Sequence, residues 1–271
     1  MNLSVRVSWL ALLAAASCVG GCKKDAPAEA APPAPSAAAA SPPTGPSAAS
    51  VEYAIDPAGK ATIDMPAPNE RIKAETSAAK GALHVDLHDL AKTRGDVFID
   101  LDTFTTHSFG DAEKDATQTH HSHTWLQIDE MERNSSVRER NRWVHFSIRS
   151  IDGLSAGDVS TVPPTRTGGE DVRVVTLVAH GDVEVHSFPA KAPKAAPLEV
   201  RFHFAPDAPP EAKPTSIEVV SKEPLTITLA DHDVKPRDAQ GIVAQKAFAI
   251  LGTKVADVAN VSVNLLAKPA S

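Results

Sequence analysis

The sequence is poor in residues on which many activities depend. Its 271 residues include two cysteines and one tyrosine, and aromatic residues make up only 4% of the chain. Both cysteines, Cys18 and Cys22, lie near the N-terminus. No disulfide framework, zinc ribbon or cysteine nucleophile is therefore expected in the body of the protein. The sequence also lacks a phosphate-binding loop, a dinucleotide-binding glycine pattern, an EF-hand loop and a His-Glu-x-x-His motif.

Positive charge is scarce as well. The formal net charge is −7 at pH 7, and the isoelectric point is about 5.9. A general nucleic-acid-binding protein needs a basic surface that displaces counterions from phosphates, so we expect no nucleic-acid partner. Long apolar runs are absent after the N-terminal segment, which leaves no other candidate for a membrane-spanning helix.

The N-terminus is organised like an export signal. Arg6 supplies a positive charge, and an apolar stretch over residues 7–19 follows it. This stretch is long enough for a signal peptide but too short to cross a bilayer. The following Gly20-Gly21-Cys22 resembles the lipobox of bacterial lipoproteins, which implies removal of residues 1–21 and acylation of Cys22. The alternative is an ordinary secretory signal with an incidental cysteine.

Residues 22–50 are rich in alanine, proline and serine and have no apolar periodicity. Such a segment cannot bury enough surface to offset the entropy cost of ordering it. We therefore expect a lipidated N-terminus followed by a disordered tether. The acyl chains on Cys22 would hold the mature protein on a membrane. The expected location is the bacterial cell envelope, outside the cytoplasm, in the periplasm or at the outer membrane.

From residue 51 onward, apolar and polar residues alternate with a period of two. The pattern is clear around Val85, Ile99, Phe146, Val200 and Ile227, and glycines and prolines interrupt it at short intervals. Such alternation is typical of antiparallel strands with one buried face. Many short strands at this spacing predict a sandwich or a barrel. Residues 51–271 are long enough to form a single barrel domain.

Three segments depart from this alternation. Residues 172–179 are apolar on both faces, which predicts a strand that is covered on both sides. Residues 111–133 and residues 239–252 have a partial helical pattern. We therefore predict an all-β fold with one or two short helical insertions.

Several short motifs in this domain resemble the YceI-like family. They are a glycine-led strand at residues 181–188 (GDVEVHSF), a proline-led strand at 197–202 (PLEVRF), an opening strand at 53–56 (YAID) and a hairpin over 81–101. The resemblance implies an antiparallel, lipocalin-like barrel with a helical insertion. It also implies a bound ligand with a long apolar tail, such as a polyisoprenoid or a quinone-type lipid, and no other cofactor.

The same resemblance makes the inward-facing apolar residues candidates for lining a ligand cavity. An eight-stranded barrel has an interior that side chains can fill or that can hold one slender ligand. The alternative is therefore that these side chains only form a core. The candidates are Leu83, Val85, Val97, Ile99, Val144, Phe146, Ile148, Val183, Val185, Val200, Phe202, Leu225 and Ile227.

A histidine cluster supports a different hypothesis. His120, His121 and His123 lie in the segment where the family has an aromatic-rich helix. His120 and His123 share a face on a helix, whereas His121 and His123 share one on a strand. Either pair offers imidazole ligands for zinc or copper, but a site needs a third ligand from elsewhere, for which His84, His88 and His107 are candidates. The alternative is a polar, solvated segment, and we expect no metal.

Two further motifs do not support catalysis. Residues 153–157 (GLSAG) match the nucleophile elbow of hydrolases, but prolines and glycines follow where that elbow requires a helix. Asp231-His232-Asp233 cannot converge on an extended chain, because His232 faces away from both aspartates. We therefore predict a non-enzymatic envelope lipoprotein that binds or carries an apolar isoprenoid-type lipid. The alternatives are a metal-binding or enzymatic protein that uses the histidine cluster, and an interaction module whose protein partner is unknown.

Overall fold

Strands dominate the chain because apolar and polar side chains alternate along it, as in β4 (Ala79–Val85) and β9 (Glu170–Val185). The structure is a computed structural model and describes residues 45–66, 71–129, 135–235 and 256–270. These residues belong to one compact unit, Pro43–Ser271. Within it, all the described strands belong to a single antiparallel sheet.

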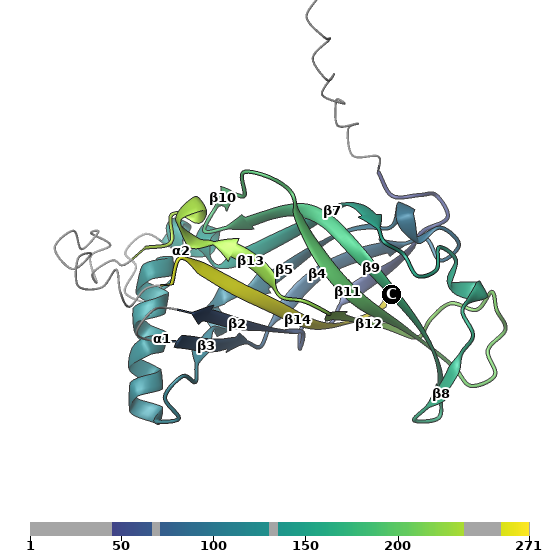
Figure 1. The fold of residues 1–271 in the computed structure, drawn as a ribbon, viewed down its shortest axis with the longest axis horizontal. Helices are drawn as coiled ribbons and strands as arrows, with labels where there is room; N and C mark the ends of the chain where they lie inside the picture. Colours follow the sequence, from purple (N-terminus) through teal and green to yellow (C-terminus); the bar gives the residue numbers. More distant parts are fainter. Residues whose placement is uncertain (1–44, 67–70, 130–134, 236–255, 271) are drawn as a thin grey trace, which may run out of the picture. The chain divides into compact units, whose positions relative to one another are not determined.

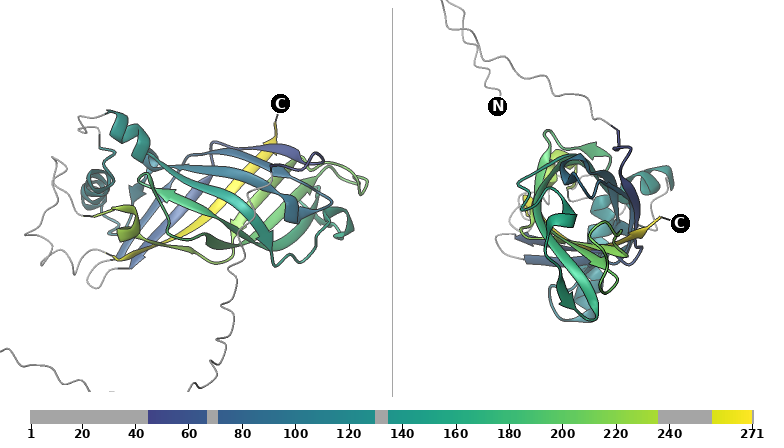
Figure 2. Two further views of the ribbon diagram at one scale, coloured as in Figure 1. Left: turned by 90° about the horizontal axis from the view of Figure 1, so that it is seen from above. Right: turned by 90° about the vertical axis from the view of Figure 1, so that its right-hand side faces the viewer.

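Eight strands of this sheet close into a barrel, because the first strand pairs with the last. The right-hand view of Figure 2 shows these strands arranged in a ring. The predicted all-β, lipocalin-like antiparallel barrel is therefore confirmed. In order around the ring, the strands are β1 (Val51–Ile55), β4, β5 (Arg94–Asp100), β7 (Trp143–Asp152), β9, β11 (Lys194–Phe204), β12 (Ser216–Ser221) and β14 (Val258–Pro269).

The last strand, β14, changes partners along its length. Its C-terminal half pairs with β1 and β12, which closes the ring. Its N-terminal half pairs instead with β2 (Lys60–Pro66) and β13 (Leu225–Thr228). Two more strands, β3 (Arg71–Thr76) and β6 (Thr105–Thr106), continue the sheet beyond β2. Different strands therefore form the barrel wall in its two halves.

Glycine is required at two places where strands approach closely. A Cβ atom at Gly181 would lie 2.4 Å from the Ser147 carbonyl oxygen, next to the bulge between Ile148 and Ser150. A Cβ atom at Gly81 would lie 2.0 Å from the Asp96 carbonyl oxygen, and the backbone there has a φ of 131°. Both contacts let adjacent strands cross tightly, as a closed barrel requires.

In the described part of the chain, two α-helices lie between β6 and β7 (Trp143–Asp152). The first, α1 (Ala112–Leu126), begins at Asp111, whose carboxylate accepts hydrogen bonds from the Glu113 and Lys114 amides. It ends at Gln127, which adopts a left-handed conformation with a φ of 54°. The second is α2 (Ser135–Asn141). The predicted helix over residues 111–133 is thus confirmed in part, and the predicted helix over 239–252 lies outside the described residues.

Short elements complete the chain. The 3₁₀-helices are η1 (Leu90–Lys92), η2 (Leu101–Thr103), η3 (Val159–Thr161) and η4 (Leu229–His232), and the remaining strands are β8 (Thr165–Thr167) and β10 (Phe188–Pro189). Figure 1 shows α1 at one end of the barrel and β8 at the other. We call these the α1 end and the far end. Residues 45–50 join β1 at the far end, where Val51 pairs with Val85.

One expectation about β9 was wrong. Residues 172–179 were expected to be covered on both faces because both are apolar. Val175, Leu177 and Ala179 do point into the barrel and are buried, but Val174 is 41% exposed on the outer face. The outer face of this strand is therefore open to solvent at Val174, although Val172 on the same face is buried.

Candidate binding cavity

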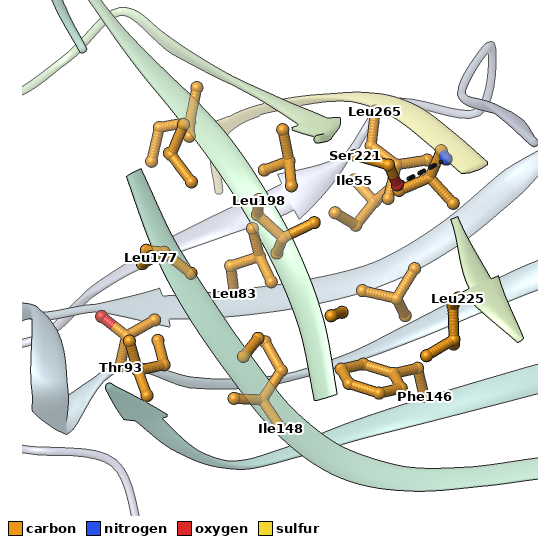
Figure 3. Close-up of a pocket in the computed structure, with 18 of the residues that line it drawn as sticks. Ile55, Leu83, Thr93, Phe146, Ile148, Leu177, Leu198, Ser221, Leu225 and Leu265 are labelled. Atoms are coloured by element: carbon orange, nitrogen blue, oxygen red, sulfur yellow. Dashed lines mark hydrogen bonds between the residues drawn. The ribbon is translucent and has the colours of Figure 1, made fainter. Parts of the chain in front are cut away.

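The inward faces of the barrel strands enclose an apolar cavity of about 140 Å³, which we call the first chamber. Aliphatic side chains from strands on all sides of the barrel form its wall. Figure 3 shows Leu83, Leu177, Leu198 and Leu265 converging on it, with Phe146 and Ile148 at one side. The interior is therefore not completely filled by side chains, unlike the dense core of most small barrels.

Almost all of the predicted lining residues meet here. All but one of the thirteen candidates line the first chamber: Leu83, Val85, Val97, Ile99, Val144, Phe146, Ile148, Val183, Val200, Phe202, Leu225 and Ile227. The exception is Val185, which lines a neighbouring cavity. The alternation of apolar and polar residues thus identified the inner faces, whereas a ligand-binding role for these residues remains a prediction.

Two hydroxyl groups are the polar side chains in the wall of the first chamber. Ser221 Oγ accepts a hydrogen bond of 2.9 Å from the Val263 amide, drawn as a dashed line in Figure 3. Thr93 Oγ1 is buried, and no described residue makes a hydrogen bond to it. The side chains of the described wall residues include no titratable group, so the wall offers neither charge nor acid–base chemistry.

A second apolar cavity of about 110 Å³ lies toward the α1 end, and we call it the second chamber. Its wall combines strand residues such as Ile63 and Met65 with Trp125 and Leu126 from α1. Four residues line both chambers: Ile99, Val144, Ile227 and Val261. We call them the junction residues.

Polar groups border the second chamber on the α1 side. Lys235 lines the chamber, and its ammonium pairs with the Asp233 carboxylate. Nearby in the chain, the Lys191 ammonium donates to the Asp231 carboxylate and lowers the pKa of Asp231 below its ordinary value. Each of these two lysines therefore has a carboxylate partner and is partly neutralised.

A network of ion pairs ties α2 to the barrel rim at the same end. Arg142 donates to both oxygens of the buried Asp100 carboxylate, at 2.8 Å from Nε and 2.6 Å from Nη2. This bond raises the pKa of Arg142 further above its ordinary value. Arg138 of α2 donates to Asp102 at 3.0 Å. The rim is thus held by charge-assisted hydrogen bonds, the strong class of such bonds.

The far end is closed by an inward-facing arginine. Arg173 is 5% exposed, and its guanidinium lies over the Phe204 ring at 4.6 Å from the ring centre. Its Nη1 atom donates to the carbonyls of Val159 and Pro210 at 3.3 and 3.2 Å. Leu90 lines the first chamber, and Arg173 and Phe204 are buried at the same end of the barrel without lining it.

The structure places the three candidate histidines on α1 but builds no metal site around them. His120 Nδ1 lies 3.0 Å from Asp129 Oδ2, and His123 Nε2 lies 2.9 Å from the Phe104 carbonyl oxygen. Within the described ranges, no group of three or more histidine, cysteine, aspartate or glutamate side chains is arranged to hold a metal ion. The possible third ligands His84 and His88 pair with Glu52 and Asp158 on other strands and loops.

The side chains of the two other sequence motifs make hydrogen bonds to nearby backbone groups. Ser155 of the GLSAG segment accepts a hydrogen bond of 3.0 Å from the Thr176 amide, and no α-helix follows it in the described chain. His232 is 1% exposed, and its Nδ1 lies 2.6 Å from the Phe188 carbonyl oxygen. Both residues therefore serve local hydrogen bonding.

Sequence reasoning missed several wall residues. Val261, Val263 and Leu265 of β14 line the first chamber; their alternation with Ser262 and Asn264 marks an inward face, although they were not among the thirteen named candidates. Leu177 also lines it, but the apolar outer face of β9 hid which side faced inward. The wall of the second chamber was not foreseen, because it depends on contacts between α1, η4 and distant strands.

Known proteins resemble this chain in structure rather than in sequence. The sequence matches no protein-family model, and no curated protein is significantly similar to it. The chain is similar to the solved structure of a polyisoprenoid binding domain from Saccharophagus degradans implicated in plant cell wall breakdown, with 13% identity and a TM-score of 0.48 over 81% of this chain and 99% of that one. It is also similar to Burkholderia cenocepacia BcnA, with 13% identity and a TM-score of 0.44 over 78% and 98% of the two chains.

The fold implied by the resemblance to YceI-like proteins is confirmed by the barrel itself, with its closing β1–β14 pair and the helices between β6 and β7. In the part of the chain that the structure describes, no helix combines the length and the hydropathy of a membrane span.

Proposed function

We propose that this protein binds or carries an apolar, isoprenoid-type lipid inside its barrel, as a lipid-anchored protein of the bacterial cell envelope. The observation that carries the proposal is the first chamber, an apolar cavity whose wall comes from all sides of the barrel. Empty apolar cavities destabilise proteins, so a cavity maintained among close-packed strands is best explained by an occupant.

The binding energy would come from desolvation of the tail. Burial of apolar surface contributes about 25 cal/mol per Å², reduced by the cost of ordering and association. Beyond apolar contact the wall offers a ligand little: the Ser221 hydroxyl is already bonded to a backbone amide, and the Thr93 hydroxyl is the one polar wall group without a described partner. A hydrocarbon tail meets these demands, whereas a sugar, nucleotide or metal ion would need polar partners.

A binding role also agrees better with this wall than catalysis does. No side chain among the described wall residues of the first chamber is an acid, a base or an activated nucleophile. We therefore propose that the protein is not an enzyme and needs no cofactor beyond the lipid it carries.

The envelope location rests on the N-terminal sequence. Arg6, the apolar residues 7–19 and the Gly20-Gly21-Cys22 motif support export and acylation. Two or more acyl chains hold a protein stably on a bilayer. In this proposal residues 22–50 tether the barrel to the membrane, and its partners are the membrane lipid and the carried ligand.

The proposal is tested by native mass spectrometry of the full chain purified gently from a bacterial envelope, with organic extraction of any adduct. We expect a bound lipid with a long isoprenoid-type tail. Leu198→Trp would fill the first chamber and remove the adduct, whereas Val174→Trp on the exposed outer face of β9 is the matched control and would keep it. A bare protein mass that is unchanged after incubation with polyprenyl lipids would overturn the proposal.

The anchor is tested separately by the intact mass of the mature chain. Cleavage before Cys22 and the mass of added acyl groups are expected in the wild type and in Cys18→Ala. Cys22→Ala would lose both the acylation and the membrane association. Acylation that persists in Cys22→Ala would refute this part.

A further inference from the structure

The two chambers are each too small for a long tail. An apolar cavity of roughly 150 Å³ holds a molecule such as benzene. The first chamber has about 140 Å³ and the second about 110 Å³. A long hydrocarbon chain must therefore occupy both, and it must pass the four residues that line both chambers.

We infer that the two chambers form one channel, and that the junction residues Ile99, Val144, Ile227 and Val261 restrict it to lipids with a single slender chain. This inference deepens the proposed function and rests on it. The restriction would exclude fused-ring lipids such as sterols, and it would require one chain of a two-chain lipid to stay outside.

The fold explains why the junction lies where it does. Val261 pairs with Ile63 of β2 and with Leu225 of β13, in the half of β14 that has left the closed ring. The first chamber lies mostly within the closed ring and includes Leu225 of β13, whereas β2, η4 and α1 contribute only to the wall of the second. The junction is thus the place where one wall replaces the other.

The junction residues are close to one another across the barrel. Ile99 and Val144 are direct partners on β5 and β7. Val144 and Val261 both pack against the apolar cluster that contains Ile227. Val144 also packs against the two other apolar clusters of the protein. The β5–β7 wall and the β13–β14 wall therefore meet at these four side chains.

The chemistry of these side chains makes the opening rigid. All four are β-branched, and branching at Cβ restricts χ1 to few rotamers. The remaining walls also contain many β-branched residues, but they include leucine and methionine side chains such as Leu198 and Met65, which adapt more readily to a ligand. The junction has no such adaptable side chain among its described residues, so it selects by cross-section.

The first test compares chain lengths in the purified full-length protein. The probe is the fluorescence of cis-parinaric acid, displaced by straight-chain alcohols from butanol to dodecanol. Each methylene that enters the channel should tighten binding about threefold to fourfold. In Val144→Phe we expect this gain to stop at a shorter alcohol, so that decanol binds about tenfold or more worse than to the wild type.

Val97→Phe is the matched control, because Val97 lines the first chamber only. This variant should weaken the binding of all the alcohols to a similar degree, and the affinity should still increase with chain length. Val261→Phe blocks the junction from the opposite wall, so it carries the test if Val144→Phe does not fold.

The second test widens the junction. A fluorescent sterol should not bind the wild type or Val97→Ala, whereas Val144→Ala combined with Val261→Ala should admit it. If no alcohol displaces the probe and none binds the wild type, the proposed function fails. If the alcohols bind but both junction-blocking variants keep the full chain-length gain, or if the wild type binds the sterol, the junction inference fails while lipid binding stands.

Discussion

The two ends of the barrel are closed by different means. At the far end, Arg173 lies over Phe204, and Val159 and Leu90 complete a nearly solvent-free plug. At the α1 end, helix α1 lies against the rim mostly through polar groups. Thr119 Oγ1 accepts from the Thr106 amide at 2.9 Å, and Ser108 Oγ donates to Gln118 at 2.6 Å.

The apolar contact of α1 with the rest of the protein is confined to its last turn. Its buried residues are Gln118, Ser122 and Leu126, and Trp125 lines the second chamber beside Leu126. Water can replace the hydrogen bonds of Gln118 and Thr119, and such exchanges cost little net free energy. Opening the far end would instead expose Phe204 and leave a buried guanidinium to rearrange. Segments with little buried apolar surface open first, so a ligand of the proposed kind would enter at the α1 end.

Replacing a ring in the far-end plug should have the largest effect. Phe204→Ala is expected to lower the free energy of unfolding by about 3–5 kcal/mol, because it leaves a cavity under Arg173. The measurement is chemical denaturation. Phe109→Ala is the control, since Phe109 is 47% exposed beside α1, and its cost should stay below about 0.5 kcal/mol. Equal losses in the free energy of unfolding for Phe204→Ala and Phe109→Ala would show that the two ends are not packed differently.

Breaking the strongest bond at the α1 end should have the next largest effect. Arg142→Gln leaves the buried Asp100 carboxylate without its bidentate donor, and we expect a loss of about 2–3 kcal/mol in denaturation experiments. Arg138→Gln removes a more exposed pair and should cost less than about 1 kcal/mol. A larger loss of stability in Arg138→Gln would show that the exposed Arg138–Asp102 pair, and not the Arg142–Asp100 pair, stabilises the rim.

The exclusion of water from the far end should be visible in the titration of Tyr53, the single tyrosine of the sequence. Burial raises the pKa of Tyr53 to about 12, and its hydroxyl lies 3.4 Å from the Pro214 carbonyl oxygen. A folded pKa above the unfolded value of about 10 means that this contribution to stability is intact below pH 10. It is lost as the pH rises toward 12.

Ultraviolet absorbance in an alkaline titration would follow Tyr53 alone. Native protein should ionise near the raised pKa of 12, and urea-unfolded protein near about 10. Ionisation at the same pH in both states would mean that water reaches the far end.

The smallest effect is expected for the contact between α1 and the rim. Thr119→Val removes the hydroxyl that accepts from the Thr106 amide, which should cost about 1 kcal/mol. Amide hydrogen exchange in α1 should accelerate by about fivefold or more, while exchange in β9 changes little. Thr117→Val, on the exposed side of the same helix, is the control. Uniform acceleration in all elements would show that α1 does not open independently.

The inner faces of the barrel could be predicted because a period of two is a local property. Leu83 and Val85, or Val183 and Val185, must share a face on any extended strand. The opening YAID strand and the glycine at position 181 also marked true strand positions.

The second chamber could not be predicted, because alternation does not say which strands are neighbours. Val261 lines both chambers only because β14 moves from β1 and β12 to β2 and β13. The exposure of Val174 could not be predicted for a related reason. In the sequence, an apolar residue on an exposed outer face cannot be distinguished from one on a buried face. Arg173 gave no signal either, since nothing local shows that its charge faces inward.

The position of β1 has a consequence for orientation in the cell. The chain joins the barrel at Val51, at the far end, and α1 lies at the opposite end. If the proposed anchor at Cys22 exists, the membrane attachment and the α1 end would be connected to opposite ends of the barrel. A lipid exchanged at the α1 end would then have to travel the length of the barrel to reach the end at which the chain enters it.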